Sequence, residues 1–68
     1  MSDVTWRSWV DGPKGCAATI MRGAIDYGVT LTVLNHDKRW FNETLTFEVR
    51  GTEKRVASFS HAIWANKL

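Results

Sequence analysis

Cysteine is nearly absent, and this limits how the fold can be cross-linked. Cys16 is the only cysteine among 68 residues, so no disulfide can form within the chain. A structural zinc site of the usual kind needs four ligands, most of them cysteine or closely spaced cysteine and histidine pairs. No such pair occurs in this sequence. We therefore expect neither a disulfide-stapled scaffold nor a metal, and no cofactor of any other kind.

A large excess of one charge is also missing. Nine Lys and Arg face seven Asp and Glu, which gives a formal net charge of +2. Residues 1–34 carry 3 − 3 = 0 and residues 35–68 carry 6 − 4 = +2. A protein that binds mainly to phosphates clusters its basic residues on one face. Here the basic pairs are Lys38-Arg39 and Lys54-Arg55, so the sequence favours a protein partner over nucleic acid.

Long apolar runs are absent as well. No segment approaches the roughly 18 consecutive apolar residues of a membrane-spanning helix. Met1, Ser2 and Asp3 are followed by polar and aromatic residues, whereas a secretory signal would continue with an apolar run. We therefore expect a cytoplasmic protein without a membrane partner.

No catalytic motif can be recognised. The glycines match neither a phosphate-binding loop nor a dinucleotide fingerprint. Cys16 is a candidate nucleophile, and His36 beside Asp37 is a candidate base, but nothing in the neighbouring sequence marks either as activated. His61 is equally unmarked. We expect no enzymatic activity and no catalytic residue.

Two segments show the alternation of apolar and polar residues that is typical of half-buried strands. The first runs from Ile25 to Val33, and the second has Leu45, Phe47 and Val49 on one face. The polar residues of both segments are largely threonines, which suit a pleated surface. Residues 35–42 lie between the two segments and predict a loop.

Residues 16–25 are ambiguous. Their apolar residues recur at helical spacing, and Pro13 suits a first helical turn. Against a helix, an internal glycine such as Gly23 costs about 1 kcal/mol. A hairpin with Arg22-Gly23 as its turn places the apolar residues on one side, and we prefer it. By the same alternation, Val4, Trp6 and Val10 face inward while Arg7 and Trp9 face outward.

The C-terminal segment predicts a helix. Thr52 can cap it, Glu53 lies in its first turn, and Val56, Phe59 and Ile63 share one face. A rival interpretation continues the sheet through Lys54–Phe59 and begins a shorter helix at Ser60. The expected fold is one α+β domain over residues 1–68: an antiparallel four-stranded β-meander followed by one C-terminal helix packed on the sheet.

Size and tryptophan content predict self-association. A core this small contributes only about 3–5 kcal/mol, and small proteins often add a disulfide, a metal or a partner subunit. The first two are disfavoured here, and the four tryptophans suit an interface. We expect a homodimer.

The leading functional hypothesis is a non-enzymatic protein-binding module, a small regulator or inhibitor of the kind that viruses encode. Tryptophan and arginine are enriched where binding energy concentrates. The candidate partner-binding residues are Trp9, Arg7, Trp40, Phe41 and Trp64. The alternative is a dimeric nucleic-acid-binding protein in which exposed aromatics stack on bases and basic loops contact phosphates. Its candidate residues are Lys38, Arg39, Arg50, Lys54 and Arg55.

Overall fold

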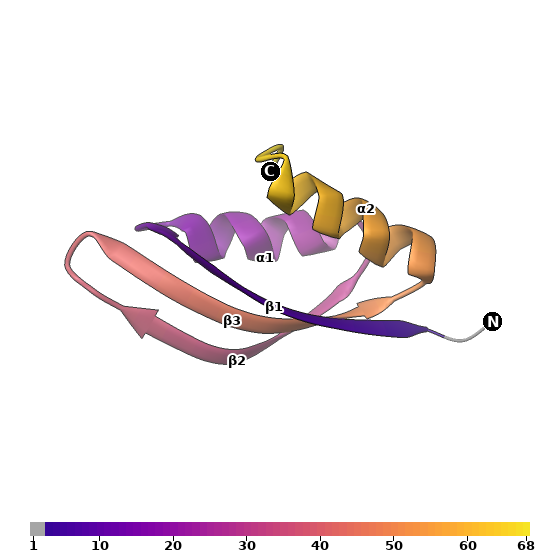
Figure 1. Cartoon of the computed structure of the whole chain (residues 1–68), viewed down its shortest axis with the longest axis horizontal. Helices are drawn as coiled ribbons and strands as arrows, with labels where there is room; N and C mark the ends of the chain where they lie inside the picture. Colours follow the sequence, from indigo (N-terminus) through magenta and orange to yellow (C-terminus); the bar gives the residue numbers. More distant parts are fainter. Residues whose placement is uncertain (1–2) are drawn as a thin grey trace.

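Three strands and two helices form a two-layer structure in the part of the chain that the computed structural model describes, residues 3–68. Their order is β1 (Val4–Pro13), α1 (Cys16–Asp26), β2 (Thr30–Lys38), β3 (Asn42–Gly51) and α2 (Glu53–Trp64). Both helices lie on the same side of the sheet (Figure 1). The other side of the sheet is left uncovered by the described residues.

The sheet has the strand order β1-β3-β2, with both neighbours antiparallel to β3. β1 and β2 therefore run parallel to each other on either side of β3, and α1 connects them. β1 pairs with β3 over its whole length, from Val4 opposite Gly51 to Pro13 opposite Asn42. The β2 register shifts between Val33 and Asn35, which is a β-bulge on an edge strand.

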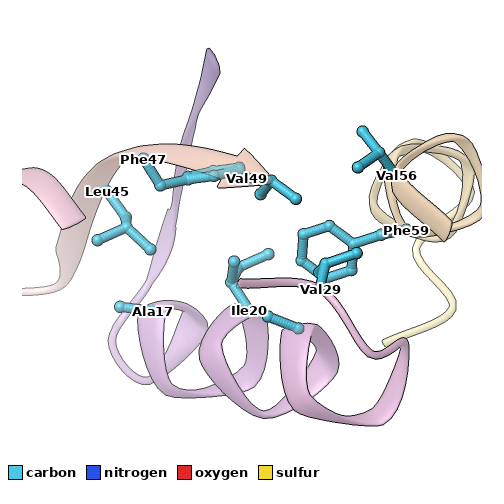
Figure 2. Packing of buried hydrophobic residues seen from close by; sticks show 9 residues of the cluster. Ala17, Ile20, Val29, Leu45, Phe47, Val49, Val56 and Phe59 are labelled. Atoms are coloured by element: carbon cyan, nitrogen blue, oxygen red, sulfur yellow. The ribbon is translucent and has the colours of Figure 1, made fainter. Parts of the chain in front are cut away.

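The core lies between the sheet and the two helices. Leu45, Phe47 and Val49 alternate along β3 and are fully buried, whereas the residues between them face the uncovered side. Side chains from α1, α2 and the segment before β2 converge on this row (Figure 2). The buried apolar residues are Ala17, Ile20, Ala24, Val29, Leu45, Phe47, Val49, Val56, Phe59 and Ala62. In the central strand β3, the alternation of apolar and polar residues therefore matches the alternation of buried and less buried side chains.

The expected four-stranded meander with a single C-terminal helix is wrong. Residues 16–26 form α1 instead of a hairpin, and Arg22-Gly23 lies within that helix rather than in a turn. The alternation that begins at Ile25 therefore overlaps the end of a helix, and the strand begins only at Thr30. The loop expected at residues 35–42 is also shorter, because β2 continues to Lys38 and β3 begins at Asn42.

Gly23 explains part of this error. Its low helix propensity disfavours a helix, but Gly23 is buried where α1 meets the C-terminal residues. A Cβ at this position would lie 2.7 Å from Leu68 Cδ2 and 3.3 Å from Phe59 Cε1. The glycine therefore allows α2 and the C-terminus to approach α1 closely, which offsets its poor helix propensity.

The other expected elements are present. α2 begins after Thr52, whose Oγ1 accepts a hydrogen bond from the Arg55 N–H at 3.3 Å. The rival interpretation, a strand through Lys54–Phe59, is therefore wrong. Along β1, Val4, Trp6 and Val10 pack toward the core while Arg7 and Trp9 are exposed, as the alternation predicts.

Candidate functional site

The turn between β2 and β3 carries the two most exposed aromatic side chains. Trp40 is 87% exposed and Phe41 is 80% exposed. The Arg39 N–H donates to the Asn42 carbonyl at 2.8 Å and closes the turn below them. We call residues 38–41 together with Lys14 the hairpin tip, because the Lys14 N–H donates to the Phe41 carbonyl at 3.2 Å. The tip lies at one end of the long axis of the molecule (Figure 1).

Folding does not account for aromatic residues at this turn. Tight hairpin turns favour Gly, Asn and Asp, which adopt positive φ or bond to their own backbone. Trp40 and Phe41 have negative φ, which most residue types can adopt. The backbone of the turn therefore does not require aromatic residues at these positions. At these exposures they also bury little apolar surface. Their side chains are therefore available to a partner.

A buried carboxylate anchors the tip to α1. Glu43 accepts hydrogen bonds at Oε2 from the N–H groups of Gly15, at 2.6 Å, and Ala17, at 3.3 Å. Its Oε1 lies 2.6 Å from His36 Nε2. Gly15, the N-cap of α1, has φ +97 and no side chain to cap the helix. Glu43 supplies that cap from β3, so the start of α1, β2 and β3 are held together beside the tip.

The hydrogen bond with His36 holds the pKa of Glu43 below its ordinary value, against the opposing effect of burial. Glu43 is therefore ionised at neutral pH, and His36 donates its Nε2–H to it. Each buried side-chain N and O atom among residues 3–68 has a hydrogen-bond partner. The hydrogen bonds of Glu43 all go to neighbouring groups of the protein, so Glu43 and His36 stabilise the local structure.

Cys16 and His36 bond to different atoms of Glu43: the Cys16 thiol donates to the Glu43 carbonyl at 3.8 Å, and His36 Nε2 lies 2.6 Å from Glu43 Oε1. Cys16 lines a depression with Val10 and Ile63, whereas His36 lines a different one with Met21 and Lys38. Burial, followed by the charges of Glu43 and Asp11, raises the pKa of the Cys16 thiol. A reactive cysteine needs the opposite shift. Within residues 3–68, no three His, Cys, Asp or Glu side chains are grouped to hold a metal ion.

The uncovered face of the sheet is a second candidate surface. Trp9 stands in the middle of β1 on this face, opposite Thr46, and is 66% exposed. Arg7 lies two residues away on the same face, where its Nε donates to Glu48 Oε1 at 2.9 Å. Five other residues of the face are threonines, Thr5, Thr30, Thr32, Thr44 and Thr46, and the charged residues Asp11, Asp37, Glu48 and Arg50 lie among them. Trp9 is therefore an exposed aromatic group among threonines and charged side chains.

The structure separates the five candidate partner-binding residues into three places. Trp9 and Arg7 share the uncovered face, and Trp40 and Phe41 form the hairpin tip. Trp64 ends α2 in the helix layer and is 79% exposed. The sequence hypothesis joins Trp9, Trp40 and Phe41 in one aromatic patch, with Trp64 as a candidate further member. Trp64 cannot join Trp9 within one copy of the chain, because the two lie on opposite sides of the sheet.

The basic candidates are separated in the same way. Lys38 and Arg39 belong to the hairpin tip, where Arg39 lies 3.6 Å from Asp37. Arg50, Lys54 and Arg55 lie at the other end, where β3 passes into α2 (Figure 1), and the longest extent of the molecule is 43 Å. Sequence reasoning missed Lys14, since its closeness to the tip depends on how β1 turns into α1.

No family model, curated protein or solved structure matches this chain. Neither of the helices described here is long and apolar enough to cross a membrane.

Proposed function

We propose that this chain is a protein-binding module, a small regulator or inhibitor that acts by docking rather than by catalysis. The observation that carries the proposal is Trp9, exposed in the middle of the uncovered sheet face with Arg7 beside it. Trp and Arg are the side chains most often found at the energetic centre of protein interfaces. The surrounding threonines would form hydrogen bonds at the rim without blocking access to the ring.

The charges of the uncovered face favour a protein partner. The charged residues on this face are Arg7, Arg50, Asp11, Asp37 and Glu48, so its formal charge is 2 − 3 = −1. Glu48 already accepts a hydrogen bond from Arg7, and Thr44 donates to Asp11 at 3.1 Å. A phosphate backbone would be weakly repelled by such a surface, whereas a protein with polar groups of both signs would be complementary to it.

A homodimer and a cytoplasmic location belong to the same proposal. The edge at β2 supports the dimer, because four large aliphatic side chains are exposed there or on the neighbouring flank of α1: Met21, Ile25, Val33 and Leu34. Residues 31–35 carry no charge, but the β-bulge between Val33 and Asn35 discourages pairing of edge strands, so the dimer proposal rests on the exposed aliphatic side chains. Light scattering tests this part: a mass of twice 7.7 kDa supports it, and a monomer at high concentration contradicts it.

Site-specific photo-crosslinking tests the docking surface. A photoreactive amino acid is placed at Thr5 or Thr32 on the uncovered face, and at Asp26 or Lys54 as matched controls on the helix side. Crosslinked adducts are formed in cells that naturally produce this protein and are identified by mass spectrometry. We expect one protein to be captured from the uncovered face and not from the controls.

The captured protein is then purified and titrated with wild-type chain and with Trp9→Thr. Loss of an interface anchor weakens binding by about thirtyfold or more. Equal capture from both faces, or equal affinity of Trp9→Thr, would contradict docking through this face.

A further inference from the structure

The hairpin tip carries the whole excess of positive charge. Its Lys14, Lys38 and Arg39 sum to +3, and the charged residues outside it, including Asp37 beside Arg39, sum to 6 − 7 = −1. These three basic side chains and that of Asp37 are exposed. A nearly neutral molecule therefore has a basic end, and the two most exposed aromatic rings are at that same end.

The tip is also held in place by neighbouring structure. Hydrogen bonds from Arg39 to Asn42 and from Lys14 to Phe41 fix its backbone, and Glu43 ties the adjacent Gly15 to β3. The Glu43 carboxylate points inward to the α1 N–H groups and His36, so it does not neutralise the exposed lysines. Because this backbone is already ordered, little conformational entropy is lost when a ligand binds here.

An open depression continues from the tip toward α1. It has a volume of about 390 Å³ and is lined by Lys14, Lys38, His36, Met21 and the first turn of α1. Both lysines therefore border a concave surface next to the protruding rings. This shape suits a chain-like ligand that passes over the tip and along the depression, better than it suits a flat bilayer.

We propose that the hairpin tip binds single-stranded nucleic acid, with bases stacking on Trp40 and Phe41 and phosphates contacting Lys14, Lys38 and Arg39. Every base has a flat face, so stacking on exposed aromatic side chains tolerates any sequence, and cations beside the rings neutralise the backbone. Unpaired bases are needed because the rings must reach base faces that a duplex keeps stacked. This site is separate from the uncovered face around Trp9.

Fluorescence anisotropy with a labelled 12-nucleotide polythymidine strand tests the proposal. Three phosphate contacts predict that log K falls with log salt concentration with a slope of about −2 for a single strand. Lys14→Ala is expected to reduce the magnitude of this slope by about 0.7. Trp40→Ala and Phe41→Ala are each expected to weaken binding by about fivefold or more, through lost stacking.

Matched controls separate the tip from the rest of the molecule. Trp64→Ala removes an exposed tryptophan elsewhere, Lys54→Ala removes a cation at the opposite end, and Trp9→Thr removes the docking anchor. All three are expected to bind the strand like wild type. Because Trp40 and Phe41 are exposed, their variants are expected to keep the circular dichroism spectrum and melting temperature of wild type.

Three results would overturn the proposal. The first is no anisotropy change at low salt, and the second is equal binding by Trp40→Ala. The third is that vesicles containing anionic phosphatidylserine, or a duplex of equal length, bind in preference to the single strand. None of these results affects the test of Trp9, so the two proposals fail independently.

Discussion

Trp6 and Trp9 lie three residues apart on β1 and face opposite sides of the sheet. Trp6 packs against the core, with its ring 5.7 Å from that of Phe47 in an edge-to-face arrangement. Trp9 faces outward and is 66% exposed. The same residue type on the same strand therefore stabilises the fold at one position and is available to a partner at the other.

The same contrast holds for the two sides of the whole sheet. The covered side carries Leu45, Phe47 and Val49, whose burial drives folding. The uncovered side carries threonines, paired charges and one large aromatic group. Alternation along a strand fixes which residues share a side, and only the placement of the helices decides which side becomes the core.

The largest expected effect of a substitution on the covered side is that of Phe47→Ala. Removing a fully buried aromatic ring costs about 3–5 kcal/mol, which is comparable to the stability of a domain of this size. We expect this variant to be largely unfolded by circular dichroism. Phe47→Leu keeps most of the volume and is expected to stay folded with a loss of about 1.5 kcal/mol in urea denaturation. A stable Phe47→Ala variant would show that the core is placed wrongly.

Glu43→Ala is expected to rank second. It leaves the N–H groups of Gly15 and Ala17 and the His36 ring without their acceptor, and buried donors without partners are destabilising. Hydrogen exchange at Ala17 should accelerate more than exchange in α2. Glu43→Gln keeps one acceptor oxygen and should lose less stability. Unchanged exchange at the start of α1 in the alanine variant would contradict the cap.

Acid should weaken the same cluster. The folded pKa of Glu43 lies below its unfolded value of 4.5, so ionised Glu43 contributes stability that is fully present above pH 4.5. This contribution is lost as the pH falls through the lowered folded pKa. We expect the urea midpoint of wild type to drop with acid more steeply than that of Glu43→Gln, which has no carboxyl group to titrate at this position. Parallel pH profiles would contradict this assignment.

A smaller effect is expected at the start of α2. Thr52→Ala removes the hydrogen bond to the Arg55 N–H and should cost about 1 kcal/mol, whereas Thr52→Ser should restore most of it. Urea denaturation measures both variants. Equal stability of the alanine and serine variants would show that the Thr52 hydroxyl does not cap the helix.

The two helix starts explain why one helix could be predicted and the other could not. α2 is preceded by its own capping residue, so its start is visible in the local sequence. α1 begins after Gly15 in a left-handed conformation, and its cap comes from Glu43, 28 residues later. A cap that depends on tertiary structure leaves no signal in the local sequence. Without that signal, the apolar residues on either side of Arg22-Gly23 resembled the two strands of a hairpin.

The candidate surfaces were predictable to a different degree. Alternation along β1 correctly placed Arg7 and Trp9 together on the outward side. The periodicity of the C-terminal helix could not show whether Trp64 is packed in the core or exposed, because that depends on how α2 packs. Lys14 was missed for a similar reason: it joins Trp40 and Phe41 through a backbone hydrogen bond that sequence spacing does not reveal.

The most direct test of the contrast between the two sides compares Trp6→Ala with Trp9→Ala in urea denaturation. Loss of the half-buried Trp6 ring should cost about 2 kcal/mol, since it removes apolar burial and the contact with Phe47. Trp9→Ala should change the free energy of unfolding by less than about 0.5 kcal/mol, as substitutions at exposed positions do. Equal losses for the two variants would mean that Trp9 serves the fold, and would contradict its assignment as a docking residue.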